Sequence, residues 1–195
     1  MRLNMFSLEY SKATYWADFA FYALAVIALA AGLAALAPRT DRVVILALAA
    51  FGWAAWSLIE YTIHRFVLHG IQPFKAWHAR HHEHPTALIG SPTVVSAALI
   101  LALVFLPALG AATYWRALSL TLGVTAGYSV YTLTHHANHH WRAGTALLKQ
   151  RKRWHSIHHH SAVGACYGVT STIWDRVFRT APRRADDGPR TSYPA

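Results

Sequence analysis

Four long apolar runs alternate with short polar stretches along the 195-residue chain. A helix needs about 20 apolar residues to cross the hydrocarbon core of a membrane, and each run approaches or reaches that length. The predicted spans cover residues 16–37, 43–63, 93–112 and 117–134. The pattern therefore predicts an all-α fold, an integral membrane four-helix bundle.

The first run has a second interpretation, because the small residues 35–37 before Pro38 resemble the cleavage site of a secretory signal peptide. Its apolar run is longer than that of a typical signal peptide, and another long run follows almost at once. A retained membrane helix is therefore favoured.

Two features inside the spans bear on packing. Pro107 lies within the third span and should kink it. Gly123 and Gly127 are four residues apart in the last span, a spacing that either allows close helix packing or is simply tolerated in a membrane helix.

The polar segments are expected to lie outside the membrane. Three prolines divide the insert 64–92 into short pieces. Residues 145–159 have a helical pattern but are too basic to cross, so they are expected at the membrane surface. Together these segments predict a cytosolic, histidine-rich helical cap. A single domain is predicted for residues 1–180, followed by a disordered tail over 181–195.

Charge orients the predicted bundle. Fifteen of the 18 Lys and Arg residues lie on the side that holds both termini and the insert 64–92. The positive-inside tendency places that side in the cytoplasm, which in a bacterial cell means the inner membrane. The formal net charge of +10 does not indicate a nucleic acid partner, because the basic clusters flank the spans, where anionic lipid headgroups attract them.

All 14 histidines lie between His64 and His160, on the predicted cytoplasmic side. Residues three and four apart share one face of a helix, which aligns imidazoles within each cluster. The sets aligned in this way are His78 with His81 and His82, His155 with His158 and His159, His135 with His139, and His136 with His140. About eleven ligand-like histidines exceed the four to six ligands of one ion, so the pattern predicts a cage for two metal ions.

The spacing does not favour every histidine equally. His64 or His69 taken alone is more typical of a polar residue at a membrane surface. One helix face cannot use every position of a run, which leaves out His84, His136 and His160. Carboxylates are scarce, and Glu60 and Asp175 are expected to hold histidine N–H groups, since Glu60 lies four residues before His64.

The identity of the metal does not follow from imidazole ligands, which suit iron, zinc, copper and nickel alike. Cys166 is the only cysteine, so no thiolate-rich site can form. Zinc would support hydrolysis or hold structure, whereas iron would activate dioxygen for the oxidation of C–H bonds. A site beside lipid acyl chains favours iron, with zinc as an alternative in the isolated protein.

Functions of other classes fit less well. Haem anchoring or transport would require polar groups in the middle of the spans, where this sequence is almost uniformly apolar. A non-enzymatic membrane metal-binding protein stays open as the alternative to an enzyme.

Four motifs resemble, in order and spacing, the histidine boxes of the fatty acid hydroxylase and sterol desaturase superfamily. They are HRFVLH, HARHHEHP, HHANHH and HSIHHHSAVGACYGVTSTIWDRVF. The last block is similar to the membrane fatty acid 2-hydroxylases that act on sphingolipid acyl chains. The resemblance covers about residues 50–180.

The resemblance implies an oxidoreductase with a dinuclear, non-haem iron centre that uses dioxygen to hydroxylate a lipid acyl chain. Its metal ligands, carried over to this chain, are His64, His69, His78, His81, His82, His135, His139, His140, His155, His158 and His159. Eukaryotic relatives often carry a fused haem domain, for which this chain has no room, so a separate ferredoxin or cytochrome is expected. The first two motifs also resemble bacterial carotenoid ring hydroxylases, which makes a carotenoid or sterol-like lipid the alternative substrate.

Overall fold

The computed structural model describes residues 9–161 and 164–182. These residues form helices joined by short turns, with an isolated β-bridge between Glu9 and Ile89. In chain order the helices are α1 (Lys12–Leu36), η1 (Arg39–Asp41), α2 (Arg42–Thr62), η2 (Ile63–Leu68), α3 (Phe74–Glu83), α4 (Thr93–Ile100), η3 (Leu101–Phe105), α5 (Leu106–Ala111), α6 (Tyr114–His140), α7 (Ala146–His160) and α8 (Ile173–Val177). The all-α prediction is confirmed, while most of the predicted tail lies outside the described residues.

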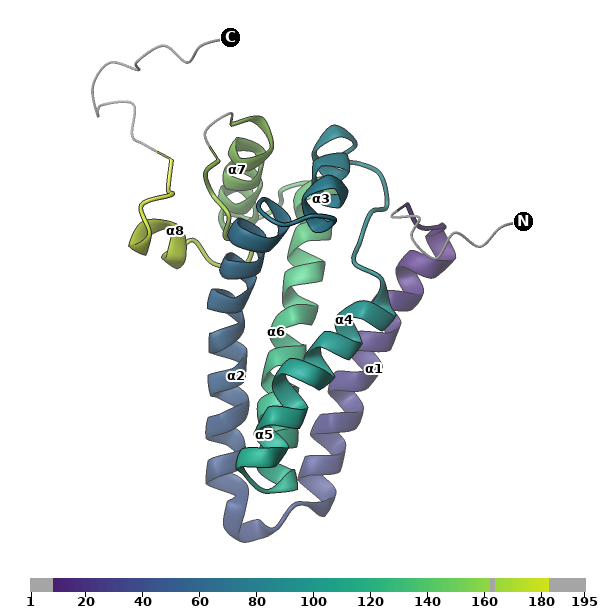
Figure 1. Ribbon diagram of the computed structural model, residues 1–195, viewed down its shortest axis with the longest axis vertical. Helices are drawn as coiled ribbons and strands as arrows, with labels where there is room; N and C mark the ends of the chain where they lie inside the picture. The colour runs from purple at the N-terminus through teal and green to yellow at the C-terminus, as the bar shows by residue number, and fades with distance from the viewer. Residues whose placement is uncertain (1–8, 162–163, 183–195) are drawn as a thin grey trace.

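Long helices make up most of the molecule, and short helices lie at one end of them (Figure 1). Helices α1, α2 and α6 and the continuous α4–η3–α5 segment run along one another, while α3, α7 and α8 lie at the end where α2 and α6 finish. Three helical segments are long and apolar enough to cross a membrane: Lys12–Leu36, Arg39–Leu68 and Thr93–Ala111. They coincide with the first three predicted spans.

The fourth predicted span, 117–134, lies within α6, which is not among the candidate membrane spans of the described residues. This helix packs along α2 and α1 and buries polar residues such as Ser119, Thr121 and Thr125. The hydroxyls of Ser119 and Thr121 donate to carbonyls one turn earlier, at 2.6 and 2.8 Å. A helix that packs against other helices does not need an entirely apolar surface.

Helices α2 and α6 approach closely at glycines. A Cβ atom placed on Gly123 would lie 2.1 Å from the Ala49 carbonyl oxygen, and one on Gly127 would lie 2.4 Å from Trp56 Cβ. Gly52 on α2 is equally crowded, since its Cβ would lie 2.6 Å from the Leu120 carbonyl oxygen. The close-packing interpretation of the glycine spacing is therefore the correct one.

The predicted distortion near Pro107 is found one turn earlier. Proline lacks the N–H that would bond to the preceding turn, and its ring crowds the carbonyl four residues back, Leu103. The chain accommodates it in the π-helical turn η3, Leu101–Phe105.

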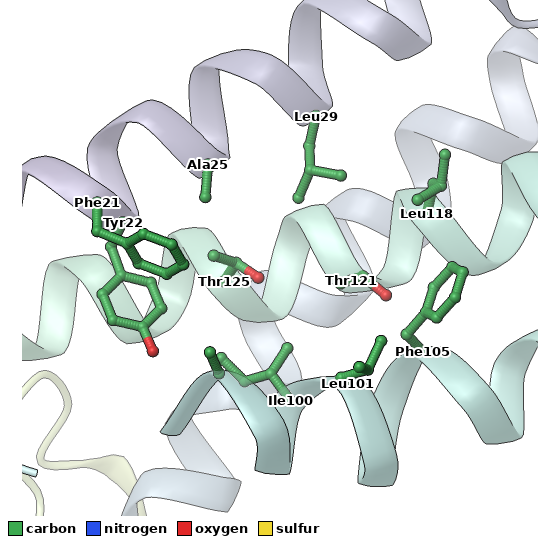
Figure 2. Close-up of a pocket in the computed structure, with 11 residues that line it drawn as sticks. Phe21, Tyr22, Ala25, Leu29, Ile100, Leu101, Phe105, Leu118, Thr121 and Thr125 are labelled. Atoms are coloured by element: carbon green, nitrogen blue, oxygen red, sulfur yellow. The ribbon is translucent and has the colours of Figure 1, made fainter. Parts of the chain in front are cut away.

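An apolar cavity of about 250 Å³ lies between α1, the α4–η3 segment and α6 (Figure 2). Phe21, Leu29, Ile100 and Phe105 contribute to its wall. The Tyr22 hydroxyl at this wall is already paired with Ser96 Oγ at 2.6 Å, so the cavity suits hydrocarbon.

Candidate metal centre

Ten histidines gather into two groups of five at the end of the molecule where the short helices lie. Within each group the candidate ligand nitrogens all lie within 4.8 Å of one another. Group one contains His64, His69, His78, His82 and His158. Group two contains His81, His135, His139, His155 and His159.

Helices α3 and α7 each supply both groups. In α3, His78 and His82 are four residues apart and join group one, while His81 belongs to group two. In α7 the division is reversed, because His155 and His159 join group two and His158 joins group one. The stacked rings of His82 and His159, with centroids 4.2 Å apart, connect the groups.

The π-helical turn η2 brings His64 and His69 together. An α-helix rotates by about 100° per residue, so two residues five apart would point about 140° away from each other. Here the His69 N–H bonds to the His64 carbonyl at 3.3 Å, and the two rings lie 5.3 Å apart. A spacing of five is therefore a ligand spacing at a π-turn, a feature often found at functional sites.

The Nε2 atoms of each group are spaced as ligands around one ion would be. In group one, His78 Nε2 lies 3.0 Å from the Nε2 atoms of both His64 and His82. In group two, His155 Nε2 lies 2.7 Å from His139 Nε2 and 3.1 Å from His159 Nε2. For metal–nitrogen bonds of about 2.1 Å, ligands at right angles lie about 3.0 Å apart, so both sets fit a first-row metal ion.

Two backbone carbonyls fix the orientation of group-one rings. His64 Nδ1 donates to the Tyr167 carbonyl at 2.6 Å, and His158 Nδ1 donates to the Ala165 carbonyl at 2.9 Å. A carbonyl only accepts hydrogen bonds, so the proton of each neutral ring is on Nδ1. Nε2 is left with the free lone pair that a metal requires.

The carbonyls of Ala165 and Tyr167 belong to the loop 164–172, which precedes α8. The two expected acids bind this loop and not a histidine directly. Glu60 accepts from the Val169 and Thr170 N–H groups at 2.6 and 2.8 Å and from the Thr170 hydroxyl. These three bonds stand in place of the expected hydrogen bond from a histidine ring, because both carboxylate oxygens of Glu60 accept from the loop. The carboxylate thus holds the segment that carries the Tyr167 carbonyl.

Asp175 holds the neighbouring residues of the same loop. Its fully buried carboxylate accepts from the Tyr167 and Gly168 N–H groups at 2.8 and 2.9 Å and from the Thr180 hydroxyl at 2.7 Å. A Cβ on Gly168 would lie 2.8 Å from Asp175 Oδ2, so glycine permits this approach. Asp175 therefore supports the histidines through the loop backbone.

Burial keeps the rings neutral. Desolvation, followed by repulsion from neighbouring histidines such as His139 and His82, lowers the pKa of His81 to about 3. The pKa of His158 is lowered to about 3 and that of His159 to about 2, again mainly by desolvation. Neutral imidazole is the form that binds metal.

The other histidines lie outside both groups. His136 Nδ1 is 3.0 Å from the Tyr15 hydroxyl, and His160 Nδ1 donates to the Ser156 carbonyl at 2.8 Å. His140, which the resemblance had included among the ligands, is exposed and stacks on His136 with a centroid distance of 4.5 Å. His84 caps the C-terminus of α3.

Comparison with known proteins matches this arrangement to one family. A family model of fatty acid hydroxylases matches residues 49–180, which contain all ten grouped histidines as well as Glu60 and Asp175. The chain belongs to the fatty acid hydroxylase family.

The chain has curated relatives in plants and fungi. It is 36% identical over 144 residues to a dihydroceramide fatty acyl 2-hydroxylase of Arabidopsis thaliana, covering 68% of this chain and 60% of that protein. It is 32% identical over 152 residues to a ceramide very long chain fatty acid hydroxylase of Schizosaccharomyces pombe, covering 66% of this chain and 40% of that protein. The chain thus spans between two fifths and three fifths of the length of these relatives.

A solved structure shares the fold. The visible hydroxylase domain of scs7p superposes with a TM-score of 0.75 at 22% identity, covering 87% of this chain and 67% of that chain. The likeness concerns the course of the backbone.

Proposed function

We propose that the chain is a membrane-bound, dioxygen-dependent hydroxylase with two metal ions, acting on the acyl chain of fatty acids or sphingolipid-type lipids. The observation that carries the proposal is the pair of five-histidine groups beside apolar helices, each with Nε2 atoms spaced for one ion. The ten grouped histidines are the proposed ligands, and His140 is left out because it lies in neither group.

The reaction converts a C–H bond into a C–OH bond and reduces the second oxygen atom of dioxygen to water, consuming two electrons and two protons. When bound, iron ions would supply the oxidising power that no protein side chain has. The protein residues hold the site: the loop carbonyls at Ala165 and Tyr167 fix two rings, and Glu60 and Asp175 fix that loop.

The names of the relatives support a proposal for the substrate and for the position of attack. They are named for hydroxylation of ceramide acyl chains, and the plant protein for hydroxylation at position 2. We propose the same carbon here, the one bonded to the acyl carbonyl. The three candidate membrane spans support a site beside a bilayer, where such chains are found.

The two electrons are proposed to come from a separate ferredoxin or cytochrome. We place the histidine groups and both termini on the cytoplasmic side of a bacterial inner membrane, because most basic residues flank that end of the helices. An electron carrier in the cytoplasm would then approach the short helices directly.

Two neighbouring histidines of α7 provide the test. His158→Ala removes a group-one ring whose Nε2 lies 3.2 Å from that of His69, whereas His160→Ala removes a ring that belongs to neither group. We expect about two irons per chain and 2-hydroxylated acyl lipids from the wild type and from His160→Ala. His158→Ala should lose bound metal and product.

The assay is metal analysis of purified protein combined with lipid analysis of the expressing membranes. Zinc alone with an unchanged lipid profile would reject the oxygenase and favour a structural or hydrolytic site. Hydroxylated ring lipids in place of acyl lipids would reject the proposed substrate. Equal loss from both variants would reject the ligand assignment.

A further inference from the structure

A second cavity, of about 430 Å³, lies against group two on the side of the short helices. Four grouped histidines form part of its wall: His139, His155 and His159 of group two, and His82 of group one. Unlike the apolar cavity among the spans, it is lined mainly by polar side chains, including Asn138 and Lys152. A polar molecule in this cavity would lie next to the metal ligands.

Asn138 is the exceptional residue of this wall. Its side chain is only 7% exposed, yet neither Oδ1 nor Nδ2 has a hydrogen-bond partner among the described residues. Buried amide groups in folded proteins are almost always paired, because removing them from water unpaired is costly. Asn138, which lines the cavity, therefore has a buried donor and a buried acceptor that are both unused.

The neighbouring cation is, by contrast, already paired. Lys152 Nζ donates to the carbonyls of Asn138 and Trp141 at 2.7 and 2.8 Å, and to that of Ala137 at 3.4 Å. Its ammonium thereby fixes the end of α6 to α7. Asn138 is held in place through its backbone while its side-chain amide has no partner.

We propose that the Asn138 carboxamide binds the polar group next to the carbon that is hydroxylated, and that this group is the secondary amide of an N-acylated lipid. The inference rests on the proposed function, which places the reacting carbon beside the acyl carbonyl. A secondary amide offers both an N–H and a C=O and can pair with Oδ1 and Nδ2 together. A free carboxylate or a thioester offers only acceptors and leaves Oδ1 unpaired.

The position of Asn138 agrees with this role. It immediately precedes His139 and follows His135 by three residues, so it lies on the same turn of α6 as two group-two histidines. An amide held there would bring the adjacent acyl carbon to the histidines. Asn138 is thus a substrate-binding residue that sets the preference for amide-linked acyl chains.

The test compares Asn138→Leu, which keeps the size of the side chain but removes both polar atoms, with Ser156→Ala at the same wall. For Asn138→Leu we expect unchanged metal content and an unfolding temperature equal to or above that of the wild type. For an N-acyl sphingoid lipid, kcat/KM should fall by about 10- to 100-fold, mainly through KM, as a lost substrate hydrogen bond predicts. Turnover of the free fatty acid should change less than threefold, and Ser156→Ala should behave as the wild type.

A binding measurement separates this inference from the proposed function. The N-acyl lipid should raise the unfolding temperature of purified wild-type protein more than its ester analogue does, and Asn138→Leu should abolish the difference. The same difference in both proteins overturns the inference, as does loss of metal or of stability in Asn138→Leu, which would indicate a packing role. Absence of any hydroxylated product from the wild type would instead refute the proposed function.

Discussion

The contact between α2 and α6 should control the histidine site from a distance. Gly123→Ala introduces a Cβ atom 2.1 Å from the Ala49 carbonyl oxygen and 2.8 Å from the Trp53 nitrogen. Both neighbours are backbone atoms, so no side-chain rotation can relieve the clash. The two helices must separate by about 1 Å to restore an ordinary contact, and such overpacking costs about 1–3 kcal/mol.

The same displacement should reach the metal ligands. Helix α2 leads directly into the turn that carries His64, and α6 carries His135 and His139. Metal–ligand distances tolerate deviations of only about 0.2 Å, so a separation of about 1 Å should weaken metal binding.

Gly32→Ala is the matched control, because nothing in the described part of the chain lies within 4 Å of a Cβ placed there. Both variants gain the helix propensity of alanine, so their difference isolates the clash. In detergent, Gly123→Ala should unfold several degrees below Gly32→Ala and retain less metal. Equal unfolding temperatures and metal contents would show that α2 and α6 are not held at this distance.

Three further predictions concern the loop, the two groups and pH. Asp175→Asn replaces an acceptor of two backbone N–H groups and should weaken metal binding about 10- to 100-fold in chelator competition, while the exposed Glu83→Gln should not. A chelator should remove metal in two phases, first from group two and then from group one. The reason is that Nδ1 of His81 has no partner among the described residues, whereas Nδ1 of His158 is held by a carbonyl. Removal in a single phase would contradict this prediction. The metal-free protein should lose stability as pH falls below 6.5, since unfolded histidines take up protons while the pKa values of buried His81 and His158 are about 3. At pH 5.5 these two should together cost about 3 kcal/mol, measured as a lower unfolding temperature than at pH 7.5.

Much of the architecture was predictable from local patterns. Apolar run length identified three spans, and the spacing of three and four aligned the rings within α3, α6 and α7. The fourth span stays a prediction, and run length does not reveal that α6 packs against α2 and α1 through buried polar residues. The spacing of His64 and His69 fits no α-helical face and was informative only through the family resemblance.

The division of the histidines could not be derived from sequence alone. Periodicity places His78, His81 and His82 on one side of a helix, but it does not say that His81 faces a different set of partners. The role of Glu60 was missed for a similar reason, since its partners lie more than 100 residues later in a loop without regular structure. Long-range contacts of this kind depend on tertiary packing.

The sharing of α3 and α7 between the groups restricts which insertions and deletions the chain can accept. One residue inserted between His78 and His81 would turn everything after it by about 100° around the helix axis. That rotation would displace His81 from group two and His82 from group one in a single step. Both groups thus depend on the helical phase of the same short segment. An insertion or deletion in α3 or α7 cannot alter one group without altering the other.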